Sequence, residues 1–299
     1  MNKLNITEHV SLKKYTTFRC GGEARFFAEP SSFVEVSDLL AFASSESMPV
    51  FVMGMGSNIL VSDSGFDGLV IRLGRNMGEI SLMDIGDSSF EIDCGAGAPL
   101  ALLGNLAVKE GLEGCEFCCG IPGSVGGGVF MNAGAYGREI KDIAVSVTYL
   151  EAGEVKTVPA SSCEFGYRKS IFTKGDSVIL GLKVRLDKGD ASAIRAYAEE
   201  LRVKRANSQP IDVPSAGSTF KRPEGYFAGK LIQDCGLKGF ALDDSGAQVS
   251  PKHSGFIVNN DGRASAKDVY RLIMYVSDTV FGKTGVRLEP EVRLIGDFS

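Results

Sequence analysis

The spacing of apolar residues predicts alternating helices and strands in the first two thirds of the chain. A capping box at Ser32 and Glu35 opens a helix with an apolar face. Further on, the period falls to two, as in half-buried strands. The predicted elements are a helix between Ser32 and Pro49, strands at 50–53, 69–73, 79–85, 90–94, 145–150, 154–158 and 177–186, and a helix from Pro99 to Gly111.

Apolar periodicity stops near residues 187–190, so a boundary is expected there. Helices are predicted at 191–206 and 228–235, and a third follows the capping box of Ser265 and Asp268. An alternating strand is expected at 286–295. The mixture of strand runs and helices indicates an α+β protein with a separate C-terminal domain.

Composition narrows the class of protein. The 299 residues are 44% hydrophobic and 23% charged, with a formal charge of −5. These values suit a globular chain and predict no nucleic-acid or membrane partner. No signal-peptide core and no apolar run of membrane-spanning length is present, so a cytoplasmic protein is expected, and we expect a monomer.

Seven cysteines in a chain of this length predict free thiols rather than a disulfide framework. Cys115 and Cys118 have the spacing of a zinc knuckle, but no second pair follows and the chain has only two histidines. We therefore expect no metal site and interpret these cysteines as small buried residues.

Glycine is the residue in excess, and 19 of the 37 glycines lie between Gly54 and Gly137. Glycine after a strand lets backbone N–H groups approach an anion, usually a phosphate. Ile59 stands where the dinucleotide fingerprint needs its third glycine, so a Rossmann site is excluded. Two glycine loops favour a ligand with an extended polyphosphate; tight turns in an ordinary sheet protein are the alternative.

Six sequence blocks, in order, resemble the UDP-N-acetylenolpyruvoylglucosamine reductase family. Any one of them is a weak signal, whereas six with compatible spacing are specific. The blocks are Thr16–Gly22, Gly54–Asn58, Gly120–Gly127 with Met131–Gly134, Phe165–Phe172, Ala216–Phe220 and Pro290–Gly296.

The resemblance implies an FAD-binding fold of the vanillyl-alcohol-oxidase type, with NADPH as reductant. Its parts would be 1–70 and 71–188, which together bind FAD, and 189–299, which binds substrate. The span from Arg168 to Ser218 is similar to the shorter branch of the family. The residues implied to bind cofactor are Gly54, Met55, Gly56, Ser57, Asn58, Gly120, Pro122, Gly123, Ser124, Gly126, Gly127, Asn132, Ala133 and Gly134.

The family reduces the enolpyruvyl group of UDP-N-acetylenolpyruvoylglucosamine to give UDP-N-acetylmuramate. This is a step of peptidoglycan precursor synthesis, and so of cell wall biogenesis, cell shape and division. The resemblance places the catalytic residues at Arg168, Ser218 and Glu291. The arginine would polarise the carboxylate and the serine would donate a proton. The glutamate would stabilise the acid-enolate as a hydrogen-bond donor if protonated, or orient the proton donor if not.

Each of these three positions also has an ordinary structural interpretation. They would be a solvated strand end, a turn and a surface strand, respectively. Alternative functions are an FAD oxidase or dehydrogenase of the same fold acting on another small substrate, and a flavin- or nucleotide-sugar-binding module without turnover. Polar residues expected to contact the UDP-sugar, or simply to form a solvated surface, are Tyr167, Lys230, Gln233, Lys238, Gln248 and His253.

Overall fold

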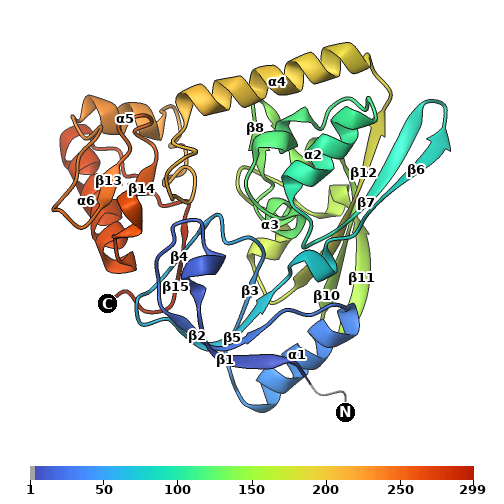
Figure 1. The fold of residues 1–299 in the computed structure, drawn as a ribbon, viewed down its shortest axis with the longest axis horizontal. Coiled ribbons are helices and arrows are strands. Elements are labelled where there is room, and N and C mark those ends of the chain that lie inside the picture. Colours follow the sequence, from blue (N-terminus) through green and yellow to red (C-terminus); the bar gives the residue numbers. More distant parts are fainter. Residues whose placement is uncertain (1–3) are drawn as a thin grey trace. The chain divides into compact units, whose positions relative to one another are not determined.

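The computed structural model describes residues 4–299 and divides the chain into two compact units (Figure 1). The first unit comprises Phe27–Met55, Val70–Lys204 and the N-terminal residues up to Ile6. The second unit comprises Thr7–Phe26, Gly56–Leu69 and Arg205–Ser299. The units are therefore assembled from interleaved segments, whereas the three predicted parts follow one another along the sequence.

The helices of the first unit follow the sequence pattern closely. Ser32 Oγ accepts the Glu35 N–H at the start of α1, as its capping box predicts. Pro99 precedes α2 without donating a hydrogen bond, which suits the first turn of a helix. The helices are α1 (Phe33–Ser45), α2 (Leu100–Lys109), α3 (Val125–Phe130) and α4 (Ala191–Ser208, whose last residues belong to the second unit), with 3₁₀ turns at Arg75–Met77, Glu116–Gly120, Ile140–Asp142, Ala160–Ser162 and Ile171–Thr173.

The main sheet of the first unit is antiparallel, in the order β11-β10-β12-β7-β6. The turn between β10 and β11 has positive φ at both Ala152 (50°) and Gly153 (80°), the conformation that matches the twist of a hairpin. The strands lying wholly in this unit are β3 (Val50–Met53), β6 (Ile80–Gly86), β7 (Ser89–Gly95), β8 (Gly134–Ala135), β9 (Arg138–Glu139), β10 (Ala144–Glu151), β11 (Glu154–Pro159) and β12 (Val178–Asp187).

A smaller sheet has the order β1-β2-β5-β3. Leu69, Val70 and Ile71 on its strand β5 are fully buried, in agreement with the continuous apolar run that predicts this strand. The residues of three of its strands are divided between the two units: β1 (Ile6–Ser11), β2 (Glu23–Ala28) and β5 (Phe66–Arg72).

The short helix α3 packs closely against the turn between β7 and α2. A Cβ added to Gly126 would lie 2.9 Å from the Cβ of Ala96, and one added to Gly128 would lie 2.8 Å from Leu100 Cδ1. Both distances are shorter than a van der Waals contact, so a side chain at either position would force Ala96 or Leu100 to shift. Gly126 and Gly128 therefore serve the close packing of α3.

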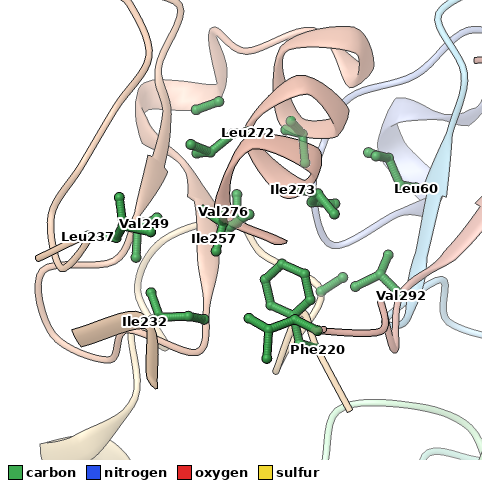
Figure 2. Close-up of a cluster of buried hydrophobic side chains, with 14 of the residues drawn as sticks. Leu60, Phe220, Ile232, Leu237, Val249, Ile257, Leu272, Ile273, Val276 and Val292 are labelled. Carbon is green, nitrogen blue, oxygen red and sulfur yellow. The ribbon is translucent and has the colours of Figure 1, made fainter. Parts of the chain in front are cut away.

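The second unit is built around α6, whose apolar face is fully buried (Figure 2). Ser265 and Asp268 form the predicted capping box at its start, and Gly285 ends it with φ 74°. The elements of this unit are a 3₁₀ turn at Leu12–Tyr15, β4 (Ile59–Val61), α5 (Ala228–Asp234), β13 (Ala247–Val249), β14 (Ile257–Asn259), a 3₁₀ turn at Asn260–Gly262, α6 (Ala266–Thr284) and β15 (Arg293–Ile295).

The predicted C-terminal strand at 286–295 is wrong in its extent. Only β15 forms a ladder, parallel to β4. Before it, a single bridge joins Pro290 to Phe220, and Pro290 has no N–H to donate to a continuous ladder. The alternating pattern marks an extended segment whose apolar side chains Leu288 and Val292 join the core.

We expect Leu272→Ala to lower the free energy of unfolding by about 2–5 kcal/mol, because Leu272 is fully buried and its truncation leaves a cavity. Met274→Ala on the same helix is the matched control, since Met274 is 38% exposed and should change stability by less than about 1 kcal/mol. Urea unfolding followed by circular dichroism measures both. Equal losses would contradict the assignment of Leu272 to the core.

Candidate active site and cofactor cradle

The two glycine loops meet at Gly54 and Ser124, within the first unit. A Cβ built on Gly54 would lie 2.0 Å from Ser124 Oγ and 2.9 Å from its Cβ. Gly54 directly follows β3, and Ser124 is the N-cap of α3. The structure therefore places the start of the first predicted loop against Ser124 of the second.

The N-terminus of α3 is closed by the protein itself. Val125 N–H donates to Ala98 O (2.7 Å), Gly126 N–H to Ala96 O (2.8 Å) and Gly127 N–H to Ser124 Oγ (3.3 Å). These are the donors that a helix start would otherwise offer to an anion. In this loop, the residues before the helix, from Gly120 to Ser124, are thus the better candidates for a pyrophosphate, and Gly126 and Gly127 serve the packing and capping of α3.

Asn132 is fully buried and forms hydrogen bonds through its whole amide group. Its Nδ2 donates to Glu139 Oε2 (3.0 Å) and to Gly166 O (3.0 Å), and its Oδ1 accepts the Lys141 N–H (3.0 Å). Both amide hydrogens therefore bond to other parts of the protein. Its neighbours Ala133 and Gly134 lead into the short pairing of β8 with β9.

Arg168 lies in a tight turn closed by reciprocal backbone hydrogen bonds between Gly166 and Lys169. The turn places Tyr167 and Arg168 at its tip, where Tyr167 is half exposed and the guanidinium carbon of Arg168 lies 5.1 Å from the centroid of the Tyr167 ring. Arg168 has φ 52°, a conformation that is unfavourable for a residue with a β-carbon.

Ser218 and Glu291 are brought together within the second unit. Thr219, the residue after Ser218, accepts the Glu291 N–H at its backbone oxygen (2.8 Å), and its own N–H donates to Gly255 O (2.8 Å). Ser218 is exposed and Glu291 is partly buried, whereas Thr219 is completely buried. The backbone pairing therefore fixes the spacing of the two predicted catalytic residues and leaves the serine accessible.

Sequence reasoning missed the importance of Thr219. Its Oγ1 accepts the Ile257 N–H (2.9 Å), so this side chain joins the Ser218 segment to β14. The available signal was its place between Ser218 and Phe220 in the Ala216–Phe220 block, where the family pattern leaves this residue unspecified.

The loop residues 56–58 lie in the second unit. Gly56 has φ 64°, its carbonyl accepts the Thr17 N–H (3.1 Å), and an added Cβ would lie 2.0 Å from Tyr15 O. Asn58 Nδ2 donates to Glu291 O (3.2 Å), and Asn58 O accepts the Arg293 N–H (3.0 Å). A residue predicted to bind cofactor therefore also contacts the backbone of a predicted catalytic residue.

The predicted substrate-binding residues differ in their surroundings. Lys230 pairs with Asp234 on the exposed face of α5 (2.6 Å), and Gln233 and Lys238 are exposed. Gln248 connects two loops of the protein, since its Nε2 donates to Gly239 O (2.9 Å) and its Oε1 accepts from Asn260 Nδ2 (2.6 Å). For Gln248 these contacts favour a structural role.

His253 lies near the start of α5, where an added Cβ on Gly229 would approach its Cε1 at 3.5 Å. Burial is the main reason that the pKa of His253 is lowered, and the positive charge of nearby Lys238 lowers it further. Its Nδ1 accepts the Gly255 N–H (3.1 Å), which leaves Nε2 to carry the proton of the neutral ring. His253 can therefore offer an Nε2–H donor at neutral pH, beside the Gly255 that pairs with Thr219.

The cysteines of the Cys115–Cys119 segment are all free thiols. Cys115 and Cys118 are completely buried, and the hydrogen bond between their thiols together with burial raises the pKa of Cys115. Among residues 4–299, the structure contains no cluster of three or more potential metal ligands. Nor does any helix in that range combine the length and apolar character needed to cross a bilayer.

Comparison with known proteins adds an independent line of evidence. Residues 24–158 match the FAD binding domain family, and residues 209–295 match the family of the UDP-N-acetylenolpyruvoylglucosamine reductase C-terminal domain. A UDP-N-acetylenolpyruvoylglucosamine reductase from Agathobacter rectalis is 48% identical over 304 residues, covering 99% of this chain and 96% of the relative. A relative of the same name from Clostridioides difficile is 42% identical, covering 99% of this chain and 95% of its own length.

A solved structure agrees with these matches. The crystal structure of UDP-N-acetylenolpyruvylglucosamine reductase from Thermus caldophilus superposes with a TM-score of 0.82 at 34% identity, covering 97% of this chain and 98% of that chain. The α+β fold with its FAD binding domain defines a flavin-dependent oxidoreductase that uses FAD. Within that class, the chain belongs to the UDP-N-acetylenolpyruvoylglucosamine reductase family.

The family, fold class and FAD cofactor predicted from the sequence are thereby confirmed. The absence of a side chain at Gly54 lets the loop after β3 approach Ser124, and a loop of this kind suits backbone contact with a pyrophosphate. We expect Gly54, Met55 and the Gly120–Ser124 loop to contact the pyrophosphate. Pro122 has no N–H and the Ile121 N–H donates to Cys118 O, so the donors must come from the other residues of these loops.

Gly54→Ala should reduce the FAD content of the purified protein. The new methyl group would overlap Ser124 Oγ, and rotating the serine away would break its hydrogen bond to Gly127 N–H. The ratio of flavin to protein absorbance measures the loss.

Two further variants test the cause of that loss. Gly54→Ala combined with Ser124→Gly should regain flavin, because glycine removes the overlap and is tolerated as an N-cap. Gly282→Ala, at a glycine with nothing within 4 Å of an added Cβ, is the matched control and should keep full flavin content. Full flavin in Gly54→Ala would show that this contact does not shape the cradle.

Proposed function

We propose that this protein reduces the enolpyruvyl group of UDP-N-acetylenolpyruvoylglucosamine to give UDP-N-acetylmuramate, with NADPH as the source of electrons. Family membership supports the substrate, since the relatives carry that substrate in their names. The structural observation that supports it most is the backbone pairing of Thr219 with Glu291, which brings the segment that carries Ser218 beside the segment that carries Glu291. The product would be a precursor of peptidoglycan.

The chemistry requires one hydride and one proton. FAD, when bound, accepts a hydride equivalent from NADPH and supplies it to the substrate. Hydride addition at the terminal carbon of the enolpyruvyl double bond leaves negative charge on the neighbouring carbon and its carboxylate. The proton must then reach that neighbouring carbon, which completes the saturated lactyl ether.

The residues of this chain provide the remaining steps. Arg168 carries a permanent positive charge on a planar guanidinium group, which suits a carboxylate that gains charge during the reaction. Ser218 is exposed on a rigid backbone and is the proposed proton donor to the carbanionic carbon. Glu291, held beside the serine segment, would stabilise the acid-enolate or orient the donor.

The surroundings of the serine support binding of the nucleotide part of the substrate near the start of α5. Gly255 connects Thr219 to His253, which offers its Nε2–H, and Gly229 approaches Gly255 closely enough that an added Cβ would lie 3.3 Å from its N–H nitrogen. Lys230 follows on the exposed side of α5. We propose that His253 and Lys230 contact the UDP-sugar.

Ser218→Ala should leave flavin reduction by NADPH within about twofold of the wild-type rate and slow flavin reoxidation by the enolpyruvyl substrate by about 10²–10⁴-fold, because the proton is needed only in the second half-reaction. Anaerobic stopped-flow absorbance of the flavin measures each step. Ser44→Ala, an exposed serine of α1, is the control and should change neither step.

The same experiment separates the alternative functions. Equal slowing of both half-reactions by Ser218→Ala would contradict a proton-donor role. Wild-type flavin that NADPH reduces, and that only oxygen reoxidises, would instead indicate an oxidase. A flavin that neither NADPH nor the enolpyruvyl substrate affects would indicate a binding module without turnover.

A further inference from the structure

The turn that carries Arg168 adopts a conformation that its own sequence does not favour. Tyr167 and Arg168 occupy the two central positions of a four-residue turn, and Arg168 has φ 52°. Glycine or asparagine is the usual residue at such a position. An arginine is strained in this conformation, so the surrounding structure must stabilise it.

Two buried side chains hold this turn from its two ends. Asn132 Nδ2 donates to Gly166 O at the first residue of the turn (3.0 Å). Ser170, which directly follows the turn, donates through Oγ to Phe130 O (2.8 Å). Asn132 and Ser170 are both completely buried, so water cannot replace either hydrogen bond cheaply.

Asn132 is itself held firmly. Besides the bond to Gly166, its amide group binds Glu139 Oε2 and the Lys141 N–H, and the Glu139 carboxylate pairs with Lys141 Nζ at 2.8 Å. Asn132 has φ 42°, which asparagine tolerates better than most residues. Three hydrogen bonds on one planar amide leave its side chain a single orientation, which makes it a rigid support.

We propose that Asn132 is a positioning residue for Arg168: by holding Gly166 it keeps the arginine turn in the conformation that directs the guanidinium group to the substrate. This inference rests on the proposed role of Arg168 in the reduction. It gives Asn132 a task different from the contact with cofactor that the sequence motif suggested, because both amide hydrogens are already bonded to the protein.

The helix α3 joins this support to the cofactor cradle. Ser124 at its start contacts Gly54, and Phe130 at its end accepts the hydrogen bond of Ser170. Because the start of α3 is anchored by its own bonds to Ala96 and Ala98, removal of the Asn132 side chain should loosen the arginine turn and leave the cradle intact.

The test uses the full-length holoenzyme and the two flavin half-reactions under anaerobic conditions. Asn132→Gly removes the amide group and keeps a residue that accepts positive φ. We expect flavin reoxidation by saturating enolpyruvyl substrate to slow by about 10²-fold, as displacement of a catalytic group by about 1 Å does. Flavin content and the rate of reduction by NADPH should stay within twofold of wild type.

Two further variants and one control accompany the Asn132→Gly measurement. Asn132→Asp keeps the shape but replaces the donors with an oxygen that faces Gly166 O, so it should slow the same step even if the glycine variant folds poorly. Ser170→Ala should slow reoxidation less, since the Asn132 bond remains. Ala152→Gly, at a positive-φ residue in the turn between β10 and β11, should behave as wild type.

A double-mutant cycle separates positioning from general structural damage. If Asn132 acts through Arg168, adding Asn132→Gly to Arg168→Ala should slow reoxidation by less than about threefold beyond Arg168→Ala alone. Multiplicative effects of the two changes, or reoxidation at the wild-type rate in both Asn132 variants, would overturn the proposal. Reoxidation at the wild-type rate in Arg168→Ala would instead overturn the proposed role of the arginine itself.

Discussion

The close packing of α3 against the connection between β7 and α2 is the constraint on which the site of the first unit depends. Gly126 and Gly128 let the helix approach Ala96 and Leu100 at distances that a methyl group would prevent. Because α3 has only six residues, both of its ends lie within one turn of the packed glycines. Ser124 at one end of α3 lies against Gly54. Asn132, just after the other end, donates to Gly166 in the turn that carries Arg168.

The second unit achieves the same precision with backbone pairing. A short antiparallel contact sets Thr219 against Glu291, and Thr219 is further joined to Gly255 and to Ile257. Thr219 and Phe220 are both buried, whereas Ser218 before them is exposed. The residues next to this pairing, Phe220 and Val292, belong to the apolar core that surrounds α6 (Figure 2).

The sequence predicted those features that depend only on residues close together in the chain. The capping box at Ser265 and the hairpin turn at Gly153 occur where the pattern indicates them, because each needs only neighbouring residues. At Ser32 the side-chain cap forms, but the Glu35 carboxylate accepts the Ser31 N–H in place of the Ser32 N–H, so that capping box is only half formed. The interleaving of the two units was not predictable, since it depends on contacts between segments far apart in sequence. The alternation at 286–295 likewise suggested one strand, because periodicity does not reveal which partners the backbone finds.

The same limit explains how far the site could be predicted. Glycine content indicated a backbone-lined cradle, yet it could not distinguish Gly54, which lies at the meeting of the two loops, from Gly126, which packs a helix. Family resemblance suggested the three catalytic positions, but the residues that hold them became visible only through long-range hydrogen bonds, such as that of Asn132 to Gly166.

Asn58 and Asn132 make the same kind of hydrogen bond in two different loops. Each belongs to a glycine-loop motif, and each donates its side-chain amide to a backbone carbonyl in a segment that carries a predicted catalytic residue: Asn58 to Glu291 and Asn132 to Gly166. A neutral amide can donate and accept at once without the cost of burying a charge. An aspartate of the same shape would present only acceptors to those carbonyls. The chemistry of the amide therefore connects the loops that suit a cofactor to the groups that would act on the substrate.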